Sequence, residues 1–464
     1  MRKAFFPVKR ETILGIAAIV GAGLALAACG GSSGSANGKR LIRVAYSSNF
    51  VFFSGTTAQQ WWSGLARAFE RQHPNATVQL VPIPGGYNDV VAKLDLLYRT
   101  PSTSPDVAQL PGSGQMGQYV SSGFLAPLDS YVANATWWSH FPSSVKAETT
   151  LQGHVYAVNQ GENNGGLYYN IPMFKKAGIP VPWQPHSWAD ILAAAEKIHA
   201  VLPNVWPVWL QGGVAGGTEA FQYAGAQLIY GSSTPVIYDS RTHKYVIDSP
   251  GLQEVFNFYH QLAARNLQAP ASVLGNPNAL NTITLLVKQG KMAIAFGNNS
   301  LGQAWSHTTC APCWPSASKT IGVAYTPTMN GQSPGHVSVL GGSELAMGAD
   351  SPNKQLAWDF INLAEQSQYM LTSGFGAGWV APDSSLWHDP AYTNFAPPYV
   401  SFFTRLLPGA PLLPELNNFT PWTEGFNEAT GAIIANNISS NQALAMFKSY
   451  VTNQLGSGSV ETIP

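Results

Sequence analysis

The sequence has little charge and few cysteines. Only 10% of its 464 residues are charged, and the 24 basic side chains balance the 24 acidic ones. A chain without a basic field lacks the electrostatic attraction that nucleic acids require, so we expect no nucleic-acid partner. The hydrophobic share of 45% is enough for a large core, and the length favours two lobes over one domain.

The common catalytic and cofactor motifs are also missing. The sequence holds no H-E-x-x-H, no Gly-Lys-Ser phosphate loop and no G-x-G-x-x-G after a strand, and its ten histidines lack metal-ligand spacing. We therefore expect no cofactor, no metal and no enzyme activity. One alternative stays open, because glycoside hydrolysis needs only two acids across a cleft. The acids nearest the candidate site segments are Glu162, Glu219, Glu344 and Glu424, and no motif pairs them.

The N-terminus is typical of an exported lipoprotein. Basic residues precede an apolar run from Ile13 to Ala28, which is shorter than the ~20 residues of a membrane span. The run ends in Leu26-Ala27-Ala28-Cys29, which resembles the bacterial lipobox. That resemblance implies a signal peptide over residues 1–28 and a lipid such as palmitate on Cys29. Residues 29–41, rich in Gly and Ser, then form a flexible linker at the extracytoplasmic face of the cell membrane.

The two other cysteines, Cys310 and Cys313, are separated by two residues. Outside the cell we expect them to form a small disulfide that closes a loop. In a reduced compartment the same spacing would favour a redox or metal-linked pair. A zinc site would need two further ligands, and His307 alone is not enough.

The first part of the expected mature chain alternates strands and helices. We predict strands over 41–46, 77–83 and 106–110 and helices over 58–72 and 87–98, since Trp62, Leu65, Ala66 and Phe69 recur at helical spacing. This β-α-β-α-β order favours a parallel sheet, whose ligand lies beyond the carboxyl ends of the strands. Ser187 with Asp190, Ser249-Pro250 and Ser351-Pro352 predict three later helix starts, and a last helix is expected over 441–454.

Several segments together resemble the family 1 extracellular solute-binding proteins. The clearest runs from Gly153-His154-Val155-Tyr156-Ala157-Val158 to Leu167-Tyr168-Tyr169-Asn170 and on to Met173-Phe174-Lys175-Lys176-Ala177-Gly178-Ile179. Gly290-Lys291-Met292-Ala293-Ile294 and Gly341-Gly342, followed by Ser351-Pro352-Asn353-Lys354, are similar to later family motifs. Each match alone is weak, but their order along most of the mature chain is the family's own.

The resemblance implies an α/β fold of two lobes, a periplasmic-binding-protein-like fold whose strands cross at a hinge. The expected crossings are near 157–166, 295–300 and 340–345. Lobe one is then residues 42–157 and 298–340, and lobe two is residues 166–296 and 345–464. Such a protein captures a small carbohydrate by hinge closure and hands it to the permease subunits of an ABC importer.

Carbohydrate binding requires flat apolar faces for C–H surfaces and amides or carboxylates for hydroxyl groups. The residues expected to contact ligand are Asn49, Tyr87, Gln115, Glu162, Asn163, Asn164, Gln211, Asn298, Asn299, Gly341, Gly342, Trp379 and Trp422. The sequence departs from many sugar-binding members at Asn298 and Asn299, where they carry an aromatic residue.

That departure leaves room for glycerol phosphate or a glycerophosphodiester. The candidate loops hold few cations for a phosphate, so a neutral sugar is favoured. Two alternatives of another class are a lipid-anchored glycoside-degrading enzyme and a surface adhesin without a small ligand.

Overall fold

The computed structural model describes residues 38–49, 56–110, 112, 115–217, 221–275, 279–306, 314, 316–416 and 418–464. These belong to one compact unit, which spans residues 35–464. The predicted signal peptide, Cys29, Cys310 and Cys313 lie outside the described residues. Among the helices of the described ranges, none combines the length and the hydropathy that a membrane span needs.

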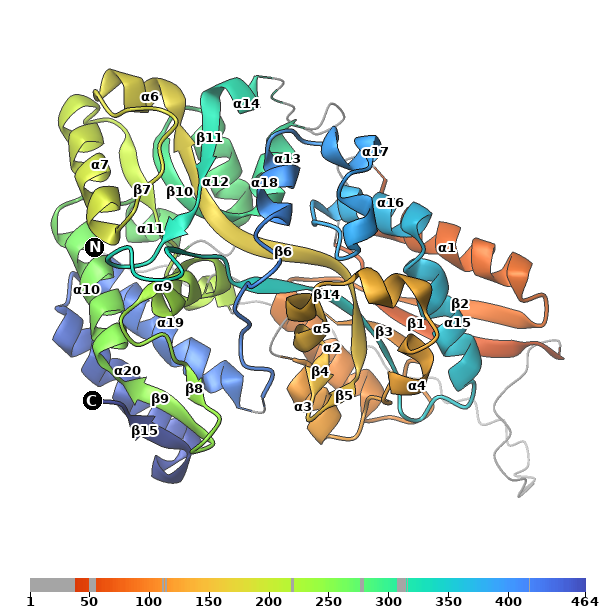
Figure 1. Ribbon diagram of the computed structural model, residues 1–464. Coiled ribbons are helices and arrows are strands. Elements are labelled where there is room, and N and C mark those ends of the chain that lie inside the picture. The colour runs from red at the N-terminus through yellow and green to blue at the C-terminus, as the bar shows by residue number, and fades with distance from the viewer. Residues whose placement is uncertain are drawn as a thin grey trace, which may run out of the picture. The chain divides into compact units, whose positions relative to one another are not determined.

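A mixed sheet runs through this unit (Figure 1) and contains eight of the described strands. Their order is β2-β1-β3-β14-β6-β10-β7, and β11 pairs with β6 beside this path. The strands are β1 (Arg40–Ser47), β2 (Ala76–Ile83), β3 (Val107–Leu110), β6 (Ala157–Asn170), β7 (Trp206–Trp209), β10 (Met292–Asn298), β11 (Ile321–Ala324) and β14 (Leu340–Met347).

Strand β6 joins the two halves of this sheet. Its first part, from Ala157 to Asn164, pairs antiparallel with β14, which in turn pairs with β3. Its second part, from Gly165 to Asn170, pairs antiparallel with β10 and β11. Because its two parts pair with different halves of the sheet, β6 forms the predicted crossing of residues 157–166. Nearly every residue of this strand is buried.

The first half of the sheet has the predicted β-α-β-α-β beginning. Strand β1 is parallel to both β2 and β3, and the helices between them occupy the predicted ranges. Helix α1 buries Trp62, Leu65 and Phe69, as the helical spacing predicted. The helices of this half are α1 (Ala58–Gln72), α2 (Tyr87–Tyr98), α3 (Met116–Ser121), α4 (Asp129–Val132), α5 (Ser143–Glu148), α15 (Lys354–Ala364) and α16 (Ser367–Ala377).

The second half has its own hydrophobic core, in which helices pack on β7 and β10. Ser187 and Asp190 form the predicted capping box, and Ser249 caps the helix that begins at Pro250. The helices of this half include α6 (Ile171–Lys176), α7 (Trp188–Val201), α9 (Ala226–Gly231), α10 (Pro250–Ala264), α19 (Phe419–Asn436) and α20 (Ser440–Leu455), the last of which covers the range predicted for the final helix.

Short elements complete the described chain. The helices are α11 (Ala271–Leu274), α12 (Ala279–Lys288), α13 (Asn299–Ser306), α14 (Ala317–Thr320), α17 (Pro390–Thr393) and α18 (Tyr399–Thr404). The 3-10 turns are η2 (Thr136–His140), η3 (Val214–Gly216), η5 (Ser384–Leu386) and η6 (Ser457–Ser459), and η4 (Phe221–Gly225) is a π-type turn. The strands are β4 (Thr150–Leu151), β5 (His154–Val155), β8 (Tyr238–Asp239), β9 (Lys244–Asp248), β12 (Thr326–Pro327), β13 (His336–Val337) and β15 (Val460–Thr462).

One predicted helix start is wrong by two residues. Helix α15 begins at Lys354 with Asn353 at its N-cap, not at Ser351-Pro352. The Ser351 hydroxyl donates to the carboxylate of Asp106 and accepts from the backbone N–H of Asn353. Ser351 therefore links the segment before α15 to Asp106, the residue directly before β3, and does not cap the helix.

The predicted division into lobes differs from the strand pairing at two segments. It placed residues 345–464 in lobe two, but Leu345, Ala346 and Met347 pair with β3, and α15 packs against α1 and β3. It placed residues 298–340 in lobe one, but β11 pairs with the second part of β6. We propose that residues 298–338 belong with lobe two and residues 340–364 with lobe one, because β14 continues along β6 into the first half of the sheet.

Candidate functional site

The candidate site is built around the first part of β6 and its partner β14. Gly342 faces Glu162 and Ser343 faces Gly161, and then the register shifts so that Glu344 faces Asn159. Such a bulge changes the direction of neighbouring side chains and often marks a functional position. Here it lies beside two buried glutamates, Glu162 and Glu344.

An amide network holds β6 to the segments around it. The backbone N–H of Asn164 donates to Asn299 Oδ1 at 2.9 Å, and Asn299 Nδ2 donates to the carbonyl of Gly378 at 2.6 Å. Asn164 Nδ2 donates to the carbonyl of Phe403 at 2.8 Å. Both side chains are fully buried, so Asn164 and Asn299 first of all fix the backbone of the crossing.

Trp379 packs directly on this crossing. A Cβ atom at Gly161 would lie 2.6 Å from Cε3 of Trp379, so only glycine leaves room for the indole. The next residue, Val380, exchanges backbone hydrogen bonds with Glu162 at 2.8 and 2.9 Å. The structure therefore brings Trp379 to the same stretch of β6 as Glu162, although the two are far apart in the sequence.

The buried glutamates form a group of mutually repelling carboxyls. Burial raises the pKa of Glu162 well above its usual range, and the carboxyls of Glu148 and Glu344 raise it further. Burial likewise raises the pKa of Glu344, with added repulsion from Glu148 and Glu415. At neutral pH such carboxyls hold protons more tightly than exposed ones do, because a charge in a dry interior is costly.

Several predicted contact residues lie together with this group. Gly341 faces Asn163 across the β14–β6 pair, and Ser300 Oγ donates to Asn163 Oδ1 at 3.1 Å. Asn298 ends β10 opposite Gly165, and its carbonyl accepts from Tyr168. The residues that the fold gathers around the crossing are Glu162, Asn163, Asn164, Asn298, Asn299, Gly341, Gly342 and Trp379.

Trp422 is not part of this group. It is fully buried in the second core, and its indole N–H donates to the carbonyl of Val246 at 2.9 Å. Its ring stacks on Phe426 and meets Phe447 edge-on. The side chain is a core residue of α19, and we withdraw it from the proposed ligand contacts.

The remaining predicted residues lie at or beside the ends of helices and strands. Gln115 is buried just before α3, and the exposed Asn49 donates to the carbonyl of Gly85. Tyr87 is the first residue of α2. Gln211 follows β7 and is half-buried, and its carbonyl accepts from Tyr259 at 2.8 Å. Their contact with ligand stays a prediction.

Two polar residues of the crossing, Asn159 and Gln160, were not predicted as contacts. Asn159 Nδ2 donates to Glu148 Oε2 at 2.8 Å, and Gln109 Nε2 donates to Gln160 Oε1 at 2.8 Å. The amides at 159 and 160 stand in the same polar run as Glu162, which was a usable signal. Glu148 carries no such signal, because only the folding of α5 onto β6 brings it there.

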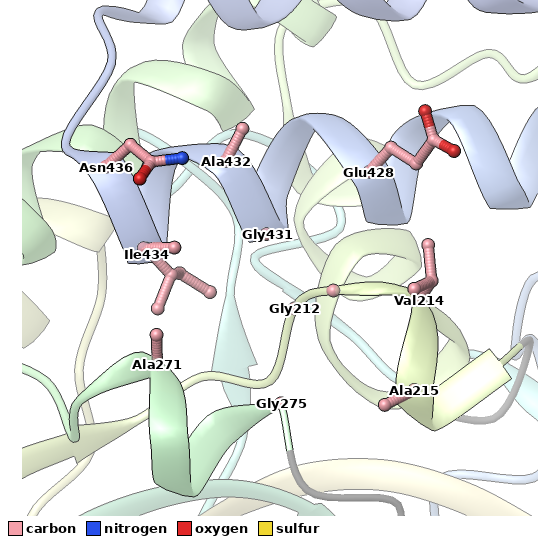
Figure 2. A pocket seen from close by; sticks show the side chains of 12 residues that line it. Gly212, Val214, Ala215, Ala271, Gly275, Glu428, Gly431, Ala432, Ile434 and Asn436 are labelled. Carbon is pink, nitrogen blue, oxygen red and sulfur yellow. The ribbon is translucent and has the colours of Figure 1, made fainter. Parts of the chain in front are cut away.

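A separate cavity of about 370 Å³ lies beyond Gln211 (Figure 2). Its walls come from η3, α11 and α19 and consist mostly of glycine, alanine and valine or isoleucine. Figure 2 shows Ile434 pointing toward Ala271, whereas Glu428 points away from both. None of the described residues that line this space is aromatic, so these residues offer a sugar ring no stacking face. Within the described ranges, no three His, Cys, Asp or Glu side chains are placed to hold a metal ion.

Known proteins with this sequence pattern and fold are solute-binding proteins. The diacetylchitobiose-binding protein DasA of Streptomyces coelicolor is 25% identical over 371 residues, which cover 78% of this chain and 79% of DasA. A protein of Brucella abortus described as a binding protein is 24% identical over 356 residues, 77% of this chain and 80% of its own. The solved GacH receptor of Streptomyces glaucescens, known unliganded and with acarbose, has a TM-score of 0.71 at 20% identity and covers 90% of this chain and 99% of its own.

These structures share the predicted two-lobed α/β fold with crossing strands, which is thereby confirmed. The family model described as bacterial extracellular solute-binding protein matches residues 54–371, which include β6, β10 and β14. Members of this family work outside the cytoplasm as binding proteins, together with ABC transporters. The chain belongs to the bacterial extracellular solute-binding proteins.

Proposed function

We propose that this protein binds a carbohydrate at the β6–β14 crossing and delivers it to an ABC importer without changing it. The observation that carries the proposal is the packing of Trp379 on Gly161 beside buried carboxyl and amide groups. An indole face and amide or carboxyl groups are what a sugar ring and its hydroxyls need. The names of relatives and structural neighbours, which bind diacetylchitobiose, acarbose and maltose, support the same class of ligand.

Glycerol phosphate is the runner-up, because two relatives are named sn-glycerol-3-phosphate-binding proteins. Its phosphate would require arginine, lysine or a helix N-terminus. The described strands of the crossing, β6, β10 and β14, instead contain no arginine or lysine, and their buried carboxyls Glu162 and Glu344 cannot neutralise an anion. The carbohydrate proposal is therefore the better supported of the two.

A thermal-shift screen of the purified full chain tests the function. The panel is D-glucose, maltose, N,N'-diacetylchitobiose and sn-glycerol 3-phosphate. Because a ligand stabilises the folded state that it binds, one carbohydrate at 100 times its Kd should add about 2.7 kcal/mol of stability. The proposal is contradicted if glycerol phosphate alone raises the melting temperature, or if none of the compounds raises it. Recovery of cleaved sugar would instead show that the protein is a glycoside hydrolase.

We further propose that a lipid on Cys29 holds the protein at the outer face of the cell membrane. The support is the lipobox-like Leu26-Ala27-Ala28-Cys29 and the Gly/Ser-rich linker that follows it. Labelled palmitate fed to expressing cells should be incorporated, and the Cys29→Ala variant should lose the label and leave the membrane fraction. A membrane-bound, labelled C29A protein would refute the anchor.

A further inference from the structure

The start of helix α13 is bonded to the crossing strand β6. The hydroxyl of Tyr168, on β6, donates to the carbonyl of Asn298 at 2.8 Å and accepts from the backbone N–H of Gly302 at 3.0 Å. This one side chain therefore bonds both the last residue of β10 and the first turn of α13. Because Tyr168 is buried, water does not compete for these two bonds, and they fix the start of α13 relative to β6.

The first side chain of α13, Asn299, has partners for its oxygen and for its amide nitrogen. Its Oδ1 accepts from the backbone N–H of Asn164 at 2.9 Å. Its Nδ2 donates to the carbonyl of Gly378 at 2.6 Å and to the carbonyl of Glu162 at 3.4 Å. An asparagine amide has two N–H donors, and both have an acceptor here. Since the residue is also fully buried, its side chain keeps no donor for a ligand.

Gln303 extends this contact by one helical turn. It lies four residues after Asn299, so the two side chains share one face of α13. Its Nε2 donates to the carbonyl of Trp379 at 3.4 Å, and the residue is fully buried. Two amides of one helix thus bond to the consecutive carbonyls of Gly378 and Trp379.

The segment that these amides hold is the one that brings Trp379 onto β6. Directly after the tryptophan, Val380 and Glu162 exchange backbone hydrogen bonds at 2.8 and 2.9 Å. The indole itself packs against Gly161. The backbone around Trp379 is therefore bonded to β6 on one side and to α13 on the other. A side chain that binds ligand keeps its geometry when supporting residues lock it in this way.

We propose that Asn299 and Gln303 are positioning residues, which set the orientation of Trp379 for the ligand and do not touch the ligand themselves. This inference rests on the proposed carbohydrate function, in which the indole supplies an apolar face for the sugar. It gives Asn299 a role through Trp379 in place of direct contact. Its consequence is that the two amides should contribute nothing to affinity once the indole has been removed.

A double-mutant cycle on the full chain tests this dependence by calorimetry. The probe is whichever of D-glucose, maltose and N,N'-diacetylchitobiose gives the largest thermal shift. Asn299→Ala should weaken binding at least about tenfold, and Gln303→Ala should weaken it less, because its hydrogen bond is longer. Trp379→Ala should weaken binding too, but adding Asn299→Ala to it should change the affinity by less than about twofold. Trp379→Leu replaces Trp379→Ala in the cycle if the alanine variant does not unfold cooperatively in urea.

Asn427→Ala is the matched control for Asn299→Ala. Asn427 is also a buried asparagine on a helix, and its Nδ2 donates to the carbonyl of Gly217 at 2.9 Å in the second half of the fold. Its replacement should lower stability in urea, as any lost buried hydrogen bond does, and leave the affinity unchanged.

Hydrogen exchange without ligand provides a readout that a general loss of stability does not move. In the Asn299→Ala variant, peptides covering residues 378–380 should exchange faster than in the unaltered chain, because their bond to α13 is lost. Peptides covering residues 40–47 of β1 should keep their rate. A merely structural role would speed exchange in both regions alike.

If Asn299→Ala costs the same affinity with and without the indole, Asn299 acts independently of Trp379, and the positioning inference is wrong while the carbohydrate function stands. The inference is equally wrong if Asn299→Ala leaves the affinity unchanged or speeds exchange in both regions. If no sugar of the thermal screen shifts the melting temperature, the proposed function fails and this inference fails with it.

Discussion

Replacing Trp422 with alanine is expected to lower the free energy of unfolding by about 3–5 kcal/mol and to leave carbohydrate affinity unchanged. The indole is fully buried, stacks on Phe426 and donates to Val246. Its removal opens a cavity in the second core and leaves a buried carbonyl without its donor. None of these contacts involves β6 or β14.

Urea unfolding of the full chain measures the stability loss. Calorimetry with the sugar that gives the largest thermal shift measures the affinity. Trp422→Phe, which keeps one ring, guards against complete unfolding and should show a smaller loss of stability. Trp138→Ala is the surface control, because that ring is only half-buried under Lys146. A tenfold loss of affinity with little loss of stability would return Trp422 to the ligand contacts.

Replacing Gly342 with alanine is expected to weaken carbohydrate binding at least about tenfold and to cost about 1–3 kcal/mol of stability. A Cβ atom at this position would lie 2.3 Å from the carbonyl oxygen of Gly161 and 2.9 Å from Glu162 Oε2. The backbone of Glu162 cannot easily yield, because it is bonded to Val380 on its other side. The added methyl therefore displaces β14 from β6 at the position of the glutamates.

Gly64→Ala is the matched control for this substitution. A Cβ atom at Gly64 meets nothing within 4 Å, and the residue lies inside helix α1. Because alanine favours helices over glycine by about 1 kcal/mol, this variant should be slightly more stable and bind sugar normally. If Gly342→Ala binds the sugar of the thermal screen as the unaltered chain does, the ligand lies away from the β6–β14 pair.

Much of the fold follows from local sequence patterns. The helix over 58–72 was predicted from apolar spacing, and the caps at Ser187 and Ser249 from residue types that accept backbone hydrogen bonds. The path of β14 was not predictable in this way. Gly341-Gly342 marked a crossing, but only the pairing of Leu345–Met347 with β3 shows to which half the strand belongs.

The site was predictable where its residues are consecutive. Glu162, Asn163 and Asn164 stand in one polar run, and the structure brings Asn298, Asn299 and Trp379 to them. Trp422 was predicted as a contact from the resemblance, which implies cleft residues in this part of the chain. Its helical spacing with Phe426, Ala429 and Ile433 instead places it on a buried face of α19. Glu148 was missed because its neighbours are set by tertiary packing alone.

Hydrogen exchange of the full chain with and without its carbohydrate is the most direct test of where the ligand binds. Bound sugar should slow exchange in peptides covering residues 157–166, 340–344 and 378–380, which meet at the crossing although they are distant in sequence. Protection confined to residues 212–215 and 431–436, around the cavity of η3 and α19, would contradict this account and place the ligand in the second half alone.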